Sequence, residues 1–153
     1  TRYMSGQKQV ILTGKLFGVD WKIKIDSYHA GKTIVDLKVM KDFAPVWVDG
    51  QGKIPFVEAW GYDIQAAIYQ AIEGNHLPFI IAGPTKEKPE PDLAIISIPQ
   101  EQIDMSMEII KANIPRFAQV KAGLIEPHRC EKCDWCKRTK KLTQIVDYRE
   151  LGA

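Results

Sequence analysis

Two acids and one lysine lie close together in an otherwise apolar part of this 153-residue chain. Asp36 and Lys38 belong to the run "IVDLK", and Asp26 ends the preceding run "VDWKIKID". Residues two apart on a β-strand share a face, so Asp36 and Lys38 are expected to lie side by side. A carboxylate and an ammonium group on a strand otherwise suited to burial require either solvent or a specific partner.

The region from residue 19 to residue 40 predicts a β-hairpin, because two alternating runs flank the turn "SYHAGK". With a loop at residues 30–32, paired residues have numbers that add up to 62. This register places Asp26 directly opposite Asp36 on one face of the sheet. The other face then carries an apolar core of two pairs: Ile25 with Leu37, and Ile23 with Val39.

Two carboxylates directly opposite each other destabilise a sheet, and a bound divalent cation removes that conflict. Oxygen ligands of this kind suit Mg²⁺ or Mn²⁺. A cation held by Asp26 and Asp36 would bind phosphate oxygens and activate a water, while Lys38 orients that water or offsets charge on the phosphate. The alternative is that the acids pair with Lys24 and Lys38 on a solvated sheet face.

The chain has three cysteines, all in the segment "HRCEKCDWCKRTKK" near its end. Cys130, Cys133 and Cys136 have the spacing Cys-x₂-Cys-x₂-Cys, which favours one metal centre over disulfides. One identity for the metal is Zn²⁺ held by the three thiolates and His128; unligated thiols are the alternative. The segment also carries more Lys and Arg than acidic residues, which suits either a polyanion or an ordinary solvated surface.

Hydrophobic periodicity predicts the elements that position these residues. Further strands are expected at residues 9–17, 77–83 and 93–99, helices at 56–74 and 100–123, and a loop at 42–55. The first helix is expected to bury one apolar stripe: Val57, Trp60, Ile64, Ile68 and Ala71. Gln65 and Tyr69 lie on another face of that helix, four residues apart. This order of elements predicts an α/β or α+β domain with a mixed central sheet.

The bulk composition is that of an ordinary globular domain, with 45% hydrophobic and 26% charged residues. The net charge of +2 points to no particular partner. The sequence contains no apolar stretch long enough to span a bilayer and no secretory signal at its start. A reducing, cytoplasmic location is therefore expected.

The segment "KIDSYHAGKTIVDLK" resembles the core of the PD-(D/E)XK nuclease superfamily, in which one Asp ends a strand and an (Asp/Glu)-x-Lys triplet follows on the next. Gln65 and Tyr69 in "YDIQAAIYQ" resemble the Gln-xxx-Tyr feature of its RecB-like branch. Together with "CEKCDWC", the wider sequence is similar to phage and prophage exonucleases of the exonuclease VIII (RecE-like) type. The resemblance implies a restriction-endonuclease-like α/β fold, with a mixed central β-sheet flanked by helices and a Cys-rich C-terminal tail.

The resemblance also implies roles for individual residues. Asp26 and Asp36 would ligate Mg²⁺ or Mn²⁺, joined by the backbone carbonyl of Leu37. Lys38 would be the catalytic lysine. The remaining two residues that match the motif would contact the active site or the DNA backbone: Gln65 and Tyr69.

In some RecB-like nucleases a 4Fe–4S cluster ties the tail to a cysteine in an upstream helical segment, which also supplies an acid to the site. No such segment precedes residue 9, so this chain is expected to be a C-terminal part or a minimal variant. Residues 1–125 are expected to form the nuclease core. Residues 126–153 are expected to form a basic tail, packed on the core, whose Cys130, Cys133 and Cys136 hold the 4Fe–4S cluster or Zn²⁺.

The activity implied by the resemblance is metal-dependent DNA exonuclease action from duplex ends, in phage or prophage recombination within a bacterial host cell. The implied partners are double-stranded DNA with a free end, a single-strand annealing protein and further copies of the chain. A non-catalytic DNA-binding module, or a structural subunit with a nuclease-like fold, is the alternative.

Overall fold

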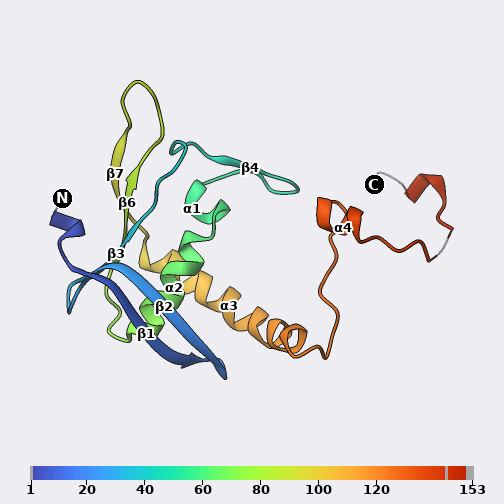
Figure 1. Cartoon of the computed structure of the whole chain (residues 1–153), viewed down its shortest axis with the longest axis horizontal. Coiled ribbons are helices and arrows are strands. Elements are labelled where there is room, and N and C mark those ends of the chain that lie inside the picture. Colours follow the sequence, from blue (N-terminus) through green and yellow to red (C-terminus); the bar gives the residue numbers. More distant parts are fainter. Residues whose placement is uncertain (1, 144, 151–153) are drawn as a thin grey trace. The chain divides into compact units, whose positions relative to one another are not determined.

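The computed structural model describes residues 2–143 and 145–150 (Figure 1). The chain divides into two compact units, residues 1–118 and residues 119–153. None of the helices in the described residues is both long and apolar enough to cross a membrane.

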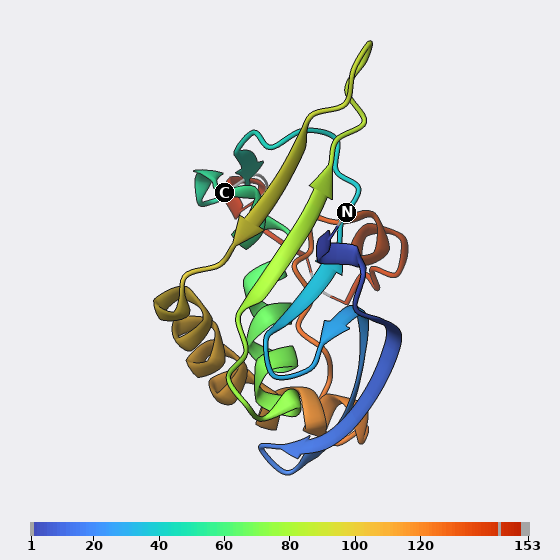
Figure 2. The same cartoon turned by 90° about the vertical axis from the view of Figure 1, so that its left-hand side faces the viewer.

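A five-stranded mixed sheet forms the centre of the first unit, in the order β1-β2-β3-β6-β7. Its strands are β1 (Gln7–Leu16), β2 (Val19–His29), β3 (Thr33–Leu37), β6 (Phe79–Pro84) and β7 (Leu93–Ser97). β3 and β6 run parallel, whereas the other neighbours are antiparallel. The parallel pair is reached by a crossover that contains α2 (Tyr62–Glu73), and Figure 2 shows this helix behind the sheet.

The core of the unit lies between the sheet and its helices. Ile23 and Ile25 on β2 are buried between exposed lysines, as the alternation in the sequence predicts. Ala66 and Ala67 of α2 are fully buried, and their small side chains let the helix lie close to the sheet. The long helix α3 (Gln100–Lys121) contributes three isoleucines to the same core: Ile103, Ile110 and Ile114. The predicted α/β class, with a mixed central sheet flanked by helices, is confirmed.

The predicted helix at 56–74 is wrong as one continuous element. The chain forms α1 (Phe56–Ala59) and then α2, and the two are separated by Trp60 and Gly61. Gly61 adopts φ 64°, which stops a helix and is accessible mainly to glycine. The break removes Trp60 from the predicted apolar stripe, and its side chain is 62% exposed.

The segment predicted as a loop at 42–55 contains a small hairpin of β4 (Val46–Val48) and β5 (Gly52–Ile54). Gly50 in its turn and Gly52 at the start of β5 both have φ 80°. Three-residue strands leave too short a period for the sequence pattern to be recognised.

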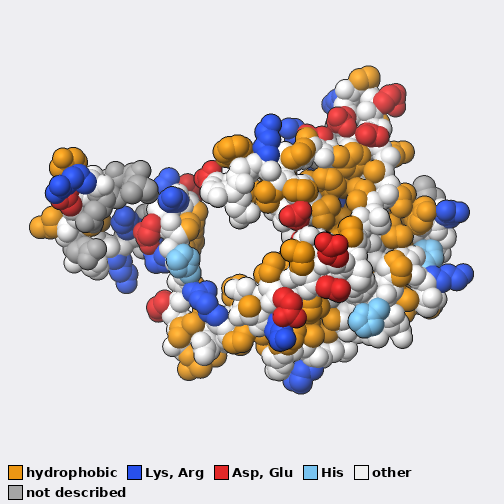
Figure 3. All heavy atoms as spheres, turned by 180° about the vertical axis from the view of Figure 1, so that it is seen from behind, with side chains coloured by type: hydrophobic (Ala, Val, Ile, Leu, Met, Phe, Trp, Pro, Cys, Tyr) orange, Lys and Arg blue, Asp and Glu red, His pale blue; other side chains and the backbone are white. Residues whose placement is uncertain are grey.

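The second unit contains the cysteines. Its described residues include the end of α3, the helix α4 (Asp134–Arg138) and the short helix η2 (Tyr148–Glu150). A further short helix, η1 (Arg2–Met4), belongs to the first unit. Figure 3 shows Lys and Arg side chains on the surface of the second unit. The division at residue 125 and the packing of the tail on the core stay predictions.

Candidate active site and cysteine cluster

The predicted hairpin register is confirmed where β2 and β3 pair. Ser27 pairs with Val35, Tyr28 with Ile34 and His29 with Thr33, so each pair of numbers adds up to 62. The ladder stops at Ser27–Val35, one step before Asp26 and Asp36 would face each other.

Asp26 continues the contact between the two strands through its side chain. The Leu37 backbone N–H donates to Asp26 Oδ2 at 3.0 Å, and Gln9 Nε2 donates to Oδ1 at 3.0 Å. On the other side of β2, the pairing with β1 skips Gln9 and Asp26, and Gln9 has φ 55°. Such local irregularities redirect side chains in a sheet. Here the irregularity accompanies a carboxylate that takes the place of a backbone acceptor opposite β3.

The predicted burial of Leu37 and Val39 is wrong. Their side chains are 44% and 56% exposed, whereas Ile23 and Ile25 are buried. β3 leaves β2 after Val35, so the pairs expected beyond that point do not form. The helix α2 covers the face of β3 that carries Ile34 and Asp36, so Leu37 lies on the opposite face.

Asp36 is the buried centre of the candidate site, with only 3% of its surface exposed. Gln65 Nε2 of α2 donates to Asp36 Oδ1 at 2.8 Å. Lys38 Nζ lies 2.7 Å from Asp36 Oδ2, and the lysine side chain is 25% exposed. The burial of a carboxylate is costly unless charged and hydrogen-bonding partners such as these compensate for it. Lys38 therefore links the buried acid to the surface.

Tyr69 is placed differently from Gln65, although both belong to α2. Its hydroxyl donates to the backbone carbonyl of Lys24 on β2 at 3.0 Å, and its ring packs edge-on against Phe79 at 5.8 Å between centroids. Tyr69 thus fixes β2 beside α2 two residues before Asp26. The structure brings Asp36, Lys38 and Gln65 into contact, and it connects Asp26 to them through the Leu37 amide.

The donor set at this site fits a hard divalent cation. Asp36 Oδ2 is buried and, in the described part of the chain, has no donor in good hydrogen-bonding geometry, although Lys38 is near. Carboxylate oxygens retain lone pairs beyond those used by Gln9, Gln65 and the Leu37 amide. The binding of Mg²⁺ or Mn²⁺ by Asp26 and Asp36 stays a prediction, which the chemistry of these oxygens supports. The Leu37 carbonyl as a third ligand stays a prediction.

The sequence analysis missed Asp63, which positions the helix that carries Gln65. Asp63 is 5% exposed, and its Oδ2 accepts hydrogen bonds from Gln102 Nε2 and Ser106 Oγ of α3, each at 2.9 Å. These bonds fix the first turn of α2 against α3. A signal was present in the sequence, because Gln102 and Ser106 lie four residues apart and hence on one helix face.

The three cysteines form a compact group in the second unit. Their sulfur atoms all lie within 4.8 Å of one another, and Cys130 Sγ is 3.8 Å from Cys136 Sγ. The Cys133 backbone N–H donates to Cys130 Sγ at 3.4 Å, and the Cys136 N–H donates to Cys133 Sγ at 3.5 Å. The structure groups the thiols without His128. Converging thiols with N–H donors are suited to a metal or an iron–sulfur cluster.

The cysteines differ in acidity. Backbone N–H groups of Cys133 and Lys132 lower the pKa of Cys130 to about 7, because they stabilise its thiolate. Burial raises the pKa of Cys136, which is 2% exposed. Cys130 therefore reaches the thiolate form, which is the form that binds metals, at a lower pH than Cys136.

Comparisons with known proteins agree with this geometry. Residues 1–139 match the model of a family described as "PDDEXK-like domain of unknown function (DUF3799)". The chain belongs to this PDDEXK-like family. It is also similar to a crystal structure from Eubacterium rectale described as a "Putative exonuclease", with 48% sequence identity and a TM-score of 0.89. The match covers 99% of this chain and 59% of that one, so this chain spans about three fifths of its structural neighbour. No match was found among curated proteins.

Membership of a PDDEXK-like family and the similarity to this neighbour confirm the predicted relation to PD-(D/E)XK nucleases. They also confirm the predicted fold, in which a mixed sheet flanked by helices precedes a Cys-rich region.

Proposed function

We propose that this chain carries the active site of a deoxyribonuclease that hydrolyses phosphodiester bonds with the help of Mg²⁺ or Mn²⁺. The observation that carries the proposal is the environment of Asp36, a buried carboxylate held between Gln65 and Lys38. Asp26 accepts a hydrogen bond from the amide of Leu37, the residue that follows Asp36, and it completes the set of oxygen ligands. The family and the exonuclease description of the structural neighbour support the same chemistry.

Each residue of the proposed site has a physical role. Asp26 and Asp36 hold the cation, which when bound polarises the phosphate and supplies a water of lowered pKa. Gln65 fixes the Asp36 carboxylate by its hydrogen bond to Oδ1. Lys38 keeps its ammonium group beside the ligand oxygen, where it offsets negative charge that develops on the phosphate. Tyr69 holds β2, and with it Asp26, beside α2.

The finer assignment follows from the family resemblance. We propose exonucleolytic action at the ends of duplex DNA, in phage or prophage recombination, beside a single-strand annealing protein and as a homo-oligomer. The "Putative exonuclease" description of the E. rectale protein supports the exonuclease part.

Degradation of end-labelled linear duplex DNA with Mg²⁺ or Mn²⁺ tests the proposal. Lys38→Ala is expected to lower the rate about 10²- to 10³-fold, the loss typical of removing one electrostatic stabiliser. Asp36→Asn is expected to abolish metal-dependent cleavage. Matched controls are Lys15→Ala and Asp20→Asn, which break an exposed ion pair at the tip of the β1–β2 hairpin and are expected to leave the rate unchanged.

Equal cleavage by the intact chain and the Lys38→Ala chain would refute the assignment. Salt-sensitive DNA binding by the intact chain without cleavage would favour the rival function, a non-catalytic DNA-binding module. A closed circular duplex, compared with the same DNA after linearisation, separates an exonuclease from an endonuclease.

We further propose that Cys130, Cys133 and Cys136 hold a 4Fe–4S cluster or Zn²⁺. The convergence of the three thiols supports a metal, and a fourth ligand completes either centre. Protein purified without oxygen would be analysed for iron, sulfide and zinc per chain, and for visible absorbance. Iron with sulfide in a coloured protein favours the cluster, whereas zinc that is lost in His128→Ala favours the Cys₃His site. A protein that carries neither metal would refute this proposal.

A further inference from the structure

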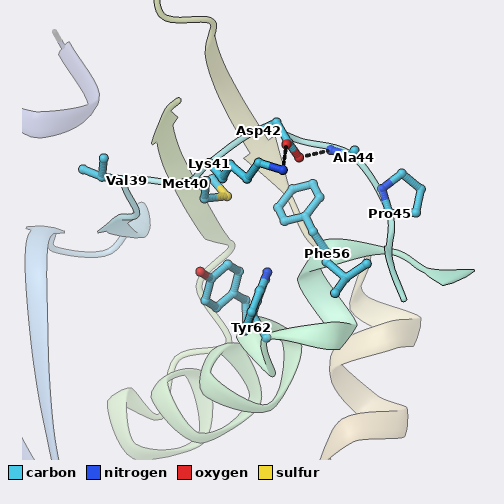
Figure 4. A pocket seen from close by; sticks show the side chains of 10 residues that line it. Val39, Met40, Lys41, Asp42, Ala44, Pro45, Phe56 and Tyr62 are labelled. Carbon is cyan, nitrogen blue, oxygen red and sulfur yellow. Dashed lines mark hydrogen bonds and ion pairs between the residues drawn. The ribbon is translucent and has the colours of Figure 1, made fainter. Parts of the chain in front are cut away.

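A partly apolar pocket lies beside the proposed site and has no role in the function proposed above. It has a volume of about 490 Å³ and is lined by residues 39–42 and 44–46, together with Phe56 of α1, Trp60 after α1 and Tyr62 at the start of α2. Figure 4 shows Phe56 and Tyr62 rising from the helices towards the segment that carries Met40, Lys41 and Asp42. The volume is within the range of pockets that bind small molecules and cofactors.

The Tyr62 side chain lies between the pocket and the proposed active site. Lys38 Nζ lies 5.2 Å from the centroid of the Tyr62 ring, and the same ring lines the pocket. One aromatic side chain therefore separates the pocket from the ammonium group beside Asp36. A ligand in the pocket would be adjacent to a phosphate at Lys38.

The chemistry of the walls suits a flat aromatic group. Trp60 lines the pocket although its side chain is 62% exposed, and Phe56 packs on Phe43 at 5.9 Å between ring centroids. At the rim, Lys41 Nζ lies 3.4 Å from Asp42, and the Asp42 carboxylate accepts a hydrogen bond from the Ala44 amide at 2.9 Å. Aromatic walls stack on bases of any sequence, and Lys41 supplies one cationic group at the rim, beside Asp42.

We propose that this pocket receives an unpaired nucleobase of the DNA strand whose phosphate lies at Lys38 and Asp36. The inference rests on the proposed function, because it is that phosphate which brings the neighbouring base within reach. Trp60 and Tyr62 would provide the stacking surfaces. A base can enter only after it leaves the duplex stack, which costs least at a strand end or in single-stranded DNA. The pocket therefore selects frayed ends and single strands.

Binding of a fluorescein-labelled single-stranded oligonucleotide to the full chain tests the inference. Ca²⁺ replaces Mg²⁺ as the oxygen-ligated cation, and a gel verifies that the DNA stays intact. Trp60→Ala is expected to weaken binding about tenfold, which corresponds to the loss of one stacked base. Trp60→Phe retains a stacking ring and is expected to bind within about threefold of the original chain.

The matched control is Trp47→Ala. Trp47 is 69% exposed on β4 and does not line the pocket, so its removal is expected to leave binding unchanged. Circular dichroism would verify that each variant is folded. Oligonucleotides with one abasic nucleotide, moved along the strand from its end, test the same contact without any protein change. One position is expected to lower the affinity of the original chain about tenfold and to have no effect on Trp60→Ala.

Unchanged oligonucleotide binding by Trp60→Ala would overturn the pocket assignment. The assignment would also fail if the abasic nucleotide weakened binding to Trp60→Ala as much as it weakened binding to the original chain. If the chain still degraded DNA in Mg²⁺, such a result would refute the base pocket but not the proposed nuclease function. Oligonucleotide binding that depends on Trp60, in a chain that does not degrade DNA, would refute the nuclease function but not the base pocket.

Discussion

Replacing Lys38 by Met is expected to leave Asp36 as a buried carboxylate without its counter-ion. Removing one partner of a buried ion pair typically costs about 3–5 kcal/mol. The lysine side chain is 25% exposed and Asp36 keeps its hydrogen bond from Gln65, so the lower end of this range, about 3 kcal/mol, is expected. In a chain of this size the loss corresponds to a decrease in Tm of about 6–12 °C.

A divalent cation is expected to reverse most of this loss. A cation at 100 times its Kd stabilises the folded state by about 2.7 kcal/mol, close to the energy lost with the lysine. In the unsubstituted chain the Lys38 ammonium group competes with the cation for Asp36 Oδ2. Mg²⁺ should therefore raise the Tm of Lys38→Met more than it raises the Tm of the unsubstituted chain.

Thermal unfolding followed by circular dichroism, in EDTA and across a series of Mg²⁺ concentrations, measures both effects. Lys15→Met is the control, because its ion pair with Asp20 is exposed and is expected to contribute at most about 1 kcal/mol. The reasoning would be refuted if Lys38→Met had the same Tm as the unsubstituted chain in EDTA. It would also be refuted if Mg²⁺ raised the Tm of Lys38→Met no more than that of the unsubstituted chain.

Two further predictions concern other parts of the chain. Ser106→Ala removes a hydrogen bond to the buried Asp63 carboxylate and is expected to lower the free energy of unfolding in urea by about 1.5–3 kcal/mol. The control Asn113→Ala, on the exposed face of α3, should cost no more than about 0.5 kcal/mol. Equal losses in the two variants would contradict the role of Asp63. In metal-free protein the alkylation rate of Cys130 should rise as the pH passes about 7, because its thiolate forms there. Cys136, whose pKa is raised, should react only at higher pH, as measured by mass spectrometry of labelled peptides. Faster labelling of Cys136 would contradict this order.

The sequence was sufficient for the parts of the fold that depend on local alternation. Ile23 and Ile25 alternate with lysines and are buried as predicted, and the numbers of the three β2–β3 pairs add up to 62 as predicted. The Asp-Leu-Lys triplet correctly placed Lys38 beside Asp36, because residues two apart share a face of a strand.

The remaining features depend on contacts between distant segments. The exposure of Leu37 follows from the face of β3 that α2 covers, which no local pattern encodes. The helical period continues through Trp60, whereas the backbone breaks at Gly61, and this break creates an exposed aromatic wall. The contact of Asp63 with α3 joins residues about forty positions apart in the sequence.

The carboxylate of Asp26 accepts the Leu37 amide at the place where the ladder between β2 and β3 has ended. In the proposed function, the Asp26 carboxylate therefore both binds the cation and closes the gap between two strands of the sheet. A descendant that abandons catalysis would still need an acceptor at position 26, because the Leu37 amide would still require a partner there. We expect such a lineage to drift towards Asn there sooner than towards Ala. The same coupling makes Asp26→Asn a cleaner inactive control than Asp26→Ala, whose loss of activity would be mixed with a loosened strand.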